Sequence, residues 1–282
     1  MLVKIFAALS AIATVLTVAL TALAETGWNL LWIVPLLLIG YFLASNVLYV
    51  LLMYLGTQFF IDLNKPQSRP SKFCRWHLDQ IAKTACLYFG AKIHVTGEEK
   101  IPTDRRFLIV CNHRSFFDPA VMVATLDKHG IIYISKKSNF RVFVGGKLMH
   151  KSGCLALDRD NNRQALGVIK RATEIITQDV GSICIYPEGT RSKTENMNPF
   201  HAGSFKIAQK AGAPVVVAAV RNTDDIMRNA FKRNTQVYLD IIGVIDAEYA
   251  KTHTTRETAD LAQGMIEEHL EKMRKETCDS GC

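Results

Sequence analysis

Charge is almost absent from the first 64 residues of this 282-residue chain, where Lys4, Glu25 and Asp62 carry the only formal side-chain charges. A soluble domain needs charged side chains over its surface, so this composition excludes an ordinary water-exposed N-terminal domain. Long uncharged stretches of apolar residues are instead typical of helices that lie in a membrane. The absence of charge therefore predicts a membrane segment at the N-terminus.

The uncharged region consists of two runs that are separated by Glu25. The first run, residues 5–24, has the length that a helix needs to cross the hydrocarbon core of a bilayer. The second run, residues 26–61, is longer than one crossing requires, which implies a tilted helix or a stretch along the surface. We therefore predict an N-terminal two-helix membrane segment over residues 1–64 and one folded domain over residues 65–282.

An alternative makes residues 1–24 a signal peptide, because Ala22-Leu23-Ala24 resembles a cleavage site. That apolar stretch is long for a signal peptide, and a second one follows at once. The positive-inside rule gives the same topology under either interpretation, because the link between the runs holds only an acidic residue. The cations that follow the second run are Lys65, Arg69, Lys72 and Arg75. We therefore expect a membrane protein whose folded domain lies on the cytoplasmic side.

Clusters of cysteine and histidine that could hold a metal or build a disulfide framework are also missing. The seven cysteines are odd in number and mostly isolated within apolar runs, which is typical of reduced thiols in a cytosolic setting. None of the His or Cys spacings makes a zinc site, so no metal is expected. Only Cys278 and Cys282, a C-x3-C pair near the C-terminus, leave metal or lipid attachment open.

Basic residues are in excess over acidic ones. The protein carries 34 Lys and Arg against 26 Asp and Glu, a net charge of +8. This balance suits an anionic membrane surface or an anionic substrate, although a merely basic surface would look the same. The cations are dispersed and no aromatic-interleaved motif accompanies them, so nucleic acid is not an expected partner. A hydrophobic content of 49%, without repeats or low-complexity tracts, excludes a disordered chain.

Strand-like and helix-like segments alternate in the second part of the chain. Expected strands cover residues 91–95, 107–111, 131–135, 154–157, 182–186, 214–220 and 237–244. Expected helices cover residues 72–88, 119–128, 142–151, 163–177 and 202–211, and a last helix starts at the capping-box pattern Thr254-x-x-Glu257. This alternation predicts a three-layer α/β domain with a largely buried sheet.

The first group of residues with a chemical pattern follows the strand at 107–111. The sequence Asn112-His113-Arg114-Ser115-Phe116-Phe117-Asp118 leads from a strand end into a helix, where α/β proteins commonly place chemistry. His113 is a candidate general base, and Asp118 could accept a hydrogen bond from its second ring nitrogen. If the substrate brings a hydroxyl, no serine or cysteine nucleophile is needed. Alternatively, Asp118 only caps the helix and His113 satisfies a backbone group of the loop.

A second group, Tyr186-Pro187-Glu188-Gly189-Thr190-Arg191-Ser192, also follows an apolar strand directly. Gly189 lets the backbone approach a ligand closely. Thr190 and Arg191 can donate hydrogen bonds to phosphate, and Arg191 can do so with two parallel bonds. Glu188 could orient that arginine or receive a substrate hydroxyl. The alternative is a simple turn with a surface salt bridge.

Together the two groups resemble the motifs of the glycerolipid acyltransferase family, and specifically of its 1-acylglycerol-3-phosphate O-acyltransferases. The family's first block, Asn-His-x4-Asp, is matched by Asn112, His113 and Asp118. Its third block, Pro-Glu-Gly-Thr-Arg-Ser, is matched residue for residue by residues 187–192. The resemblance covers roughly residues 85–225, and the identity, order and spacing of the motifs all agree.

Weaker blocks of the family agree in part. The lysine that the family places after a strand is matched by Lys136, and the Gly-x4-Asp-Arg pattern by residues 153–159. Ser138-Asn139 stands where the family often has Glu-Leu, which leaves the details of the acceptor pocket open. Pro214 is followed by three valines where a Pro-x-x-Pro block is common, and we expect this change to alter only a strand edge.

The resemblance implies an enzyme that moves a fatty acyl group from acyl-CoA or acyl-carrier protein to the sn-2 hydroxyl of 1-acylglycerol-3-phosphate, without a cofactor. His113, held by Asp118, would be the general base. The lysophospholipid would arrive from the membrane lipid bilayer and the acyl donor from the cytosol. The residues that the resemblance implies for substrate binding are Lys136, Arg159, Glu188, Gly189, Thr190 and Arg191.

Three other functions remain open. Another lysophospholipid or an aminolipid could be the acceptor, because residues 138–139 depart from the family pattern. In a membrane thioesterase, water would replace the alcohol at His113. A non-catalytic lipid-binding protein would keep the phosphate contacts without needing a dyad, so the intact pair His113 and Asp118 argues against it.

Overall fold

The computed structural model describes residues 1–20, 30–63, 65, 69–192, 194, 196–230, 232 and 234–279. The chain divides into two compact units, Met1–Lys65 and Pro66–Cys282. Residues 22–25, which hold the cleavage-like sequence and the acidic link, lie outside the described residues, as do Cys282 and the side chain of Cys278. The first unit contains the two uncharged runs, and the second contains both chemical motifs.

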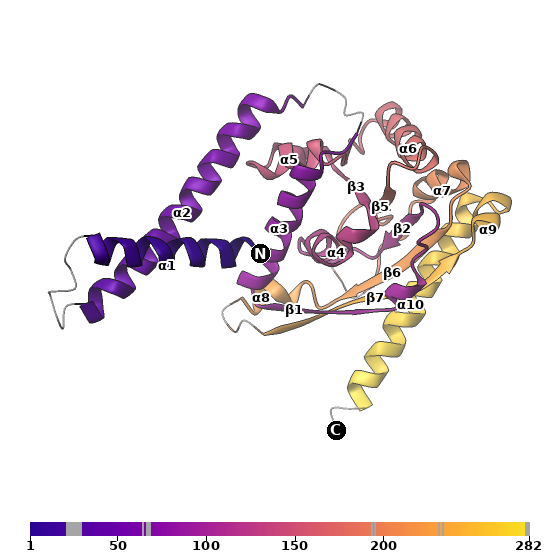
Figure 1. The fold of residues 1–282 in the computed structure, drawn as a ribbon. Coiled ribbons are helices and arrows are strands. Elements are labelled where there is room, and N and C mark those ends of the chain that lie inside the picture. Colours follow the sequence, from indigo (N-terminus) through magenta and orange to yellow (C-terminus); the bar gives the residue numbers. More distant parts are fainter. Residues whose placement is uncertain are drawn as a thin grey trace. The chain divides into compact units, whose positions relative to one another are not determined.

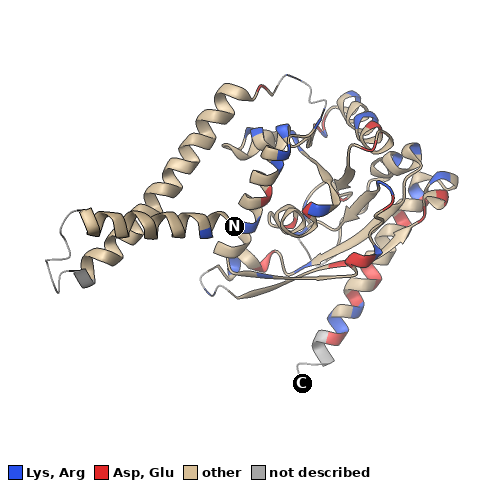
Figure 2. Ribbon diagram, in the orientation of Figure 1, with Lys and Arg blue, Asp and Glu red and all other residues tan. Residues whose placement is uncertain are grey.

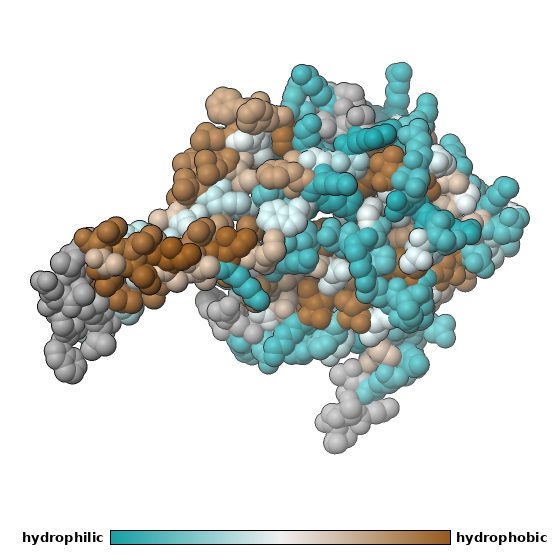
Figure 3. All heavy atoms as spheres, viewed as in Figure 1, coloured by the Kyte–Doolittle hydropathy of each residue, from teal (hydrophilic) through white to brown (hydrophobic). Residues whose placement is uncertain are grey.

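Two helices form the N-terminal unit, α1 (Leu2–Leu20) and α2 (Leu30–Phe60). Figure 2 shows them almost without charged residues, and Figure 3 shows hydrophobic side chains along them. Inside this unit the hydroxyls of Thr17 and Tyr41 lie 2.7 Å apart, so two polar groups of the apolar helices satisfy each other. Both helices are long and apolar enough to cross a membrane. The two expected helices are present, and their insertion into a bilayer stays a prediction.

A seven-stranded sheet forms the centre of the second unit. Its strands are β1 (Ala91–Thr96), β2 (Leu108–Cys111), β3 (Ile131–Lys136), β4 (Leu155–Leu157), β5 (Ser182–Ile185), β6 (Val215–Arg221) and β7 (Thr235–Ile245). They lie in the order β1-β7-β6-β2-β5-β3-β4, and only β6 and β7 pair antiparallel. The central strands β2 and β5 are buried along their whole length, as expected for parallel strands with both faces covered.

Helices pack against both faces of this sheet (Figure 1). The helices are α3 (Lys72–Tyr88), α4 (Asp118–Leu126), α5 (Gly145–Lys151), α6 (Asn162–Thr177), α7 (Lys206–Ala211), α8 (Asp225–Arg228), α9 (Ala247–Thr252) and α10 (Thr255–Asp279). One apolar core joins α3, α4 and α8 to the sheet, and the other joins α6, α7, α9 and α10 to it. In β2, Ile109 and Cys111 enter the first core, whereas Leu108 and Val110 enter the second. The predicted three-layer α/β fold is confirmed.

The differences from the expected elements are local. The capping box is formed, because the Thr254 N–H donates to Glu257 Oε2 at 2.7 Å and the Glu257 N–H donates to Thr254 Oγ1 at 3.2 Å. The predicted start of the helix over residues 142–151 was wrong. It begins only at Gly145, because Val144 adopts a left-handed φ of 52° that a helix does not accommodate. Helices α8 and α9 were not expected, since so few residues show no apolar period.

Gly97, which follows β1, is expected to tolerate no side chain. Its φ is +70°, and a Cβ atom there would lie 2.2 Å from the carbonyl oxygen of Ile241 in β7. Gly212, at the end of α7, has a similar φ of +60° but no atom within 4 Å of such a Cβ. We expect Gly212→Ala to cost about 1 kcal/mol of backbone strain. Gly97→Ala should lower the melting temperature much further, because the backbone of β7 must also move. Thermal unfolding in detergent compares the two, and equal melting temperatures would contradict this packing.

Candidate active site

The expected site residues follow parallel strands at one edge of the sheet. The strands β6, β2, β5, β3 and β4 are neighbours and all run in the same direction. Their carboxyl ends therefore meet along one edge, where α/β proteins bind ligands. His113 follows β2, Glu188 follows β5, Lys136 ends β3 and Arg159 follows β4. The topology thus gathers residues that are far apart in the sequence.

His113 and Asp118 form a hydrogen-bonded pair at the centre of this edge. His113 Nδ1 lies 2.7 Å from Asp118 Oδ2, and Asp118 is fully buried at the start of α4. The same carboxylate oxygen accepts the backbone N–H groups of Arg114 at 2.7 Å and Ser115 at 2.8 Å. Asp118 therefore fixes the loop that carries His113 as well as contacting the imidazole ring.

The imidazole ring of His113 is also held on its face. The ring of Tyr186 stacks against it, with 4.4 Å between the centroids and 29° between the planes. Because a carboxylate only accepts hydrogen bonds, Nδ1 carries the proton that Asp118 accepts, and Nε2 is the basic nitrogen. The described residues make no hydrogen bond to Nε2, and the His113 side chain is 17% exposed. This arrangement suits a general base that takes a proton from a bound hydroxyl.

Glu188 fastens the His113 loop to the segment after β5. Its Oε1 accepts the His113 N–H at 2.6 Å and its Oε2 accepts the Asn198 N–H at 2.8 Å. Burial of this side chain raises the pKa of its carboxyl above the ordinary value. Ser192 adds two hydrogen bonds, because its N–H and its hydroxyl donate to the His113 carbonyl at 2.8 Å and 3.1 Å. The described contacts of the Glu188 carboxylate are thus with backbone N–H groups and do not include Arg191.

Asn112 fastens the other side of the same loop to β6. Its Nδ2 donates to the Val220 carbonyl at 3.0 Å, and its Oδ1 accepts the Val220 N–H at 2.8 Å. Just beyond β6, the Thr223 hydroxyl donates to Asp118 Oδ1, and the Ser115 hydroxyl donates to the Thr223 carbonyl at 2.9 Å. The loop that carries the dyad is therefore held from both neighbouring strands.

Tyr186 and Thr223 were not among the residues expected at the site. Tyr186 lies within the second motif, but an aromatic residue at a strand end is more often part of a core, so its stacking on His113 was not foreseen. Thr223 had a usable signal, because it comes shortly after an expected strand, as His113 does. A hydroxyl residue in that position is therefore a candidate site residue on the same ground as those of the two motifs.

The expected phosphate-binding residues lie at the same edge, and the described hydrogen bonds of His113 and Asp118 do not include them. Lys136, Arg159, Thr190 and Arg191 are exposed. Lys136 is the register partner of Leu157, so Arg159 emerges beside it from the neighbouring strand. Since neighbouring strands lie about 4.8 Å apart, the ends of β3 and β4 are about 10 Å and 14 Å from the end of β2. Long cationic side chains at this range can reach a phosphate whose hydroxyl neighbour lies at His113.

Gly189 is required by the turn in which it lies. Its φ is +74°, a Cβ atom there would lie 2.9 Å from the ring of His201, and its N–H donates to the Tyr186 carbonyl at 3.1 Å. The conformation of the second motif therefore depends on glycine even without a ligand. Within the described part of the chain, no group of three or more His, Cys, Asp and Glu side chains could hold a metal ion.

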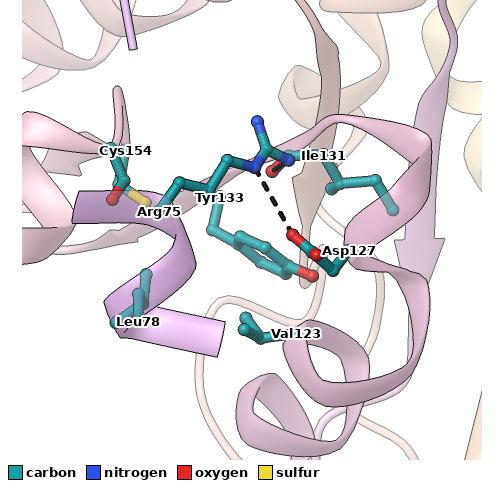
Figure 4. Close-up of a pocket in the computed structure, with 8 residues that line it drawn as sticks. Arg75, Leu78, Val123, Asp127, Ile131, Tyr133 and Cys154 are labelled. Atoms are coloured by element: carbon teal, nitrogen blue, oxygen red, sulfur yellow. Dashed lines mark hydrogen bonds and ion pairs between the residues drawn. The ribbon is translucent and has the colours of Figure 1, made fainter. Parts of the chain in front are cut away.

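A small cavity lies away from this edge, between α3, α4 and β3 (Figure 4). Its volume of about 20 Å³ has room for one water molecule and not for a lipid. Arg75 borders it, with Nη2 donating to the Ile131 carbonyl at 2.7 Å and Nε lying 3.8 Å from Asp127. Because Ile131 is the first residue of β3, the cavity lies toward the amino end of that strand and does not belong to the site.

Known proteins are similar to this chain in sequence and in fold. The sequence profile of the Acyltransferase family matches residues 92–221. A chloroplast 1-acyl-sn-glycerol-3-phosphate acyltransferase of Brassica napus is 29% identical over 184 residues, which are 65% of this chain and 52% of that protein. The 1-acyl-sn-glycerol-3-phosphate acyltransferase of Borreliella burgdorferi is 30% identical over 172 residues, 59% of this chain and 68% of that protein. This chain thus spans about half the length of the first relative.

The fold also matches a solved structure, that of the 1-acyl-sn-glycerophosphate (LPA) acyltransferase PlsC from Thermotoga maritima. The two align over 83% of this chain and 92% of that chain, with a TM-score of 0.61 and 21% sequence identity. At this identity the likeness concerns the fold. Taken with the sequence relatives, it leads to a plain assignment: the chain belongs to the acyltransferase family.

The variant Glu188→Gln is expected to change how stability depends on pH. Because burial raises the pKa of Glu188, the folded protein binds this proton at a higher pH than the unfolded chain, whose ordinary value is 4.5. The stability linked to this shift is fully present below pH 4.5 and is lost as the pH rises through the folded pKa. The melting temperature of the wild type should therefore rise relative to that of Glu188→Gln as the pH falls from neutral. Thermal unfolding across pH tests this, and a difference that instead grows toward high pH would contradict it.

Proposed function

We propose that the protein is a membrane-associated 1-acylglycerol-3-phosphate O-acyltransferase. It transfers a fatty acyl group from a thioester, acyl-CoA or acyl-carrier protein, to the sn-2 hydroxyl of lysophosphatidic acid and so forms phosphatidic acid. The observation that carries the proposal is the 2.7 Å contact between His113 Nδ1 and Asp118 Oδ2 at the carboxyl edge of the sheet. The sequence relatives named as 1-acyl-sn-glycerol-3-phosphate acyltransferases support the choice of acceptor.

The reaction follows from the chemistry of the dyad. Nε2 of His113 takes the proton of the sn-2 hydroxyl while the hydroxyl oxygen attacks the thioester carbonyl, and Asp118 stabilises the imidazolium that forms. When the tetrahedral intermediate collapses, the carbon–sulfur bond breaks and the thiolate leaves with the proton from His113. The acyl group passes directly to the acceptor, so the step needs neither an acyl-enzyme nor a cofactor.

The acceptor phosphate is held by the exposed cations of the same edge. Lys136 and Arg159 come from adjacent strand ends, and Arg191 with Thr190 comes from the turn after β5. Arginine binds phosphate with two parallel hydrogen bonds, and lysine adds a mobile positive charge. Glu188 and Gly189 shape this region by holding its backbone. The apolar α1 and α2 keep the enzyme at the lipid surface, where acceptor and product both reside.

The variant His113→Ala is expected to lose acyl transfer by a factor of about 1,000, because the general base is removed. Lysophosphatidic acid and a long-chain acyl-CoA are supplied to the detergent-solubilised protein, and free thiol and phosphatidic acid are measured together. In the wild type both products should appear in step. His94→Ala is the control, since His94 is an exposed histidine on β1 that contacts Gln236. Activity that survives in His113→Ala would refute the mechanism.

The same assay separates the alternative functions. Thiol release without phosphatidic acid would point to a thioesterase, or to a different acceptor that a panel of lysolipids would reveal. Acceptor-dependent thiol release with another lysolipid, but not with lysophosphatidic acid, would keep the acyl-transfer chemistry and change the substrate.

The variants Lys136→Gln and Arg159→Gln are each expected to raise the KM for lysophosphatidic acid about tenfold, because each removes a charged hydrogen-bond donor to phosphate. The KM for the acyl donor should change little. Lys92→Gln, an exposed lysine on β1, is the matched control. An unchanged acceptor KM in both variants would mean that the phosphate binds elsewhere.

A further inference from the structure

The second oxygen of the Asp118 carboxylate is held by a side chain from a distant part of the chain. Oδ2 accepts three hydrogen bonds from its own loop, from the imidazole and from two backbone N–H groups. Oδ1 accepts a short hydrogen bond from the hydroxyl of Thr223. Asp118 is fully buried and Thr223 is 1% exposed, so water does not compete for this bond. Within the described residues, Thr223 is the donor that serves Oδ1.

The turn after β6 places Thr223 at this position. Asn222 adopts a left-handed φ of 63°, which asparagine tolerates better than most residues, and its Nδ2 donates to the Gln236 carbonyl at 3.0 Å. On the other side of Thr223, the fully buried Ile226 anchors the short helix α8 in the apolar core. Thr223 is therefore held on both sides, by the hydrogen bond of Asn222 and by the buried side chain of Ile226.

Two further contacts join this turn to the loop of the dyad. The Ser115 hydroxyl donates to the Thr223 carbonyl at 2.9 Å, and Arg114 Nη2 donates to Asp224 Oδ2 at 3.3 Å. Both donors belong to the loop between His113 and Asp118. The backbone of the loop is thus attached to the turn independently of the Thr223 hydroxyl. Removing that hydroxyl should leave the loop in place and change only the carboxylate.

We propose that Thr223 is a positioning residue of the reaction, and the proposal rests on the function proposed above because Thr223 acts only through the dyad. Its hydroxyl fixes the rotation of the Asp118 carboxylate, so that Oδ2 stays directed at His113 Nδ1. Because of this hydroxyl, both oxygens of the carboxylate accept hydrogen bonds, Oδ2 from the loop and Oδ1 from Thr223. Without the hydroxyl, Oδ1 is buried without a partner, and the carboxylate can turn away from Nδ1, so it stabilises the protonated imidazole less.

The variant Thr223→Val removes the hydroxyl and nearly keeps the shape of the side chain. We expect kcat to fall about tenfold, the loss expected for one hydrogen bond to a charged group, with little change in the acceptor KM. We also expect the acid limb of the pH–rate profile to move to lower pH, because the protonated imidazole loses part of the stabilisation that the Asp118 carboxylate gives it. Thr223→Ser, which restores the hydroxyl, should return both quantities toward those of the wild type.

Thr235→Val is the matched control for this experiment. Thr235 lies in β7, is 3% exposed, and its hydroxyl has no hydrogen-bond partner among the described residues. The variant makes the same chemical change at similar burial without touching the dyad, and its kcat and pH profile should equal those of the wild type. Thermal unfolding of each variant shows that the folded protein is being assayed. If Thr223→Val does not fold, Thr223→Ala removes the same hydroxyl and is measured in its place.

The outcomes distinguish this inference from the function on which it rests. Wild-type kcat and pH profile in Thr223→Val, with an inactive His113→Ala, would overturn the role of Thr223 and leave the acyltransferase proposal standing. A uniform loss at every pH that Thr223→Ser does not restore would make Thr223 a structural residue and also overturn the inference. Full activity in His113→Ala would overturn the proposed function itself.

Discussion

The buried carboxylate of Asp118 is the interaction on which the rest of the site depends. Its two oxygens accept hydrogen bonds from the imidazole of His113, from two backbone N–H groups of the loop and from the Thr223 hydroxyl. A buried carboxylate without such donors would be costly, so the loop cannot relax without losing several favourable contacts at once. The orientation of His113 is thereby tied to the fold and does not rest on one weak hydrogen bond.

The position of β2 in the sheet explains how this loop is kept rigid. Its neighbours β6 and β5 run parallel to it, so all three strands end at the same edge. Asn112 contacts the end of β6, and Glu188 returns from the segment after β5 to bind the backbone of His113. In the proposed reaction, this arrangement presents a preset base to a lipid hydroxyl, and the mobile cations at the outer strands adjust to its phosphate.

Much of the fold could be predicted because its signals are local. Apolar runs between turn residues mark the seven strands, and the capping box at Thr254 marks the start of α10. Residues 142–144 were predicted wrongly, because their apolar side chains suit a helix while the left-handed φ of Val144 keeps the helix from starting before Gly145. The short helix α8 was not predicted either. It is held in place by the burial of Ile226 in the core, and its few residues show no helical period.

The sequence by itself determined that His113 and Asp118 would lie close together, because only a short loop between a strand and a helix separates them, and the structure shows that they form a hydrogen bond. It also determined which residue types would gather at the carboxyl edge of the sheet. Only the tertiary structure decided that Glu188 would bind the His113 backbone and that Thr223 would reach Asp118. These contacts join residues 75 and 105 positions apart. Their meeting depends on the strand order β6-β2-β5, which is set by packing between distant segments and leaves no trace in local periodicity.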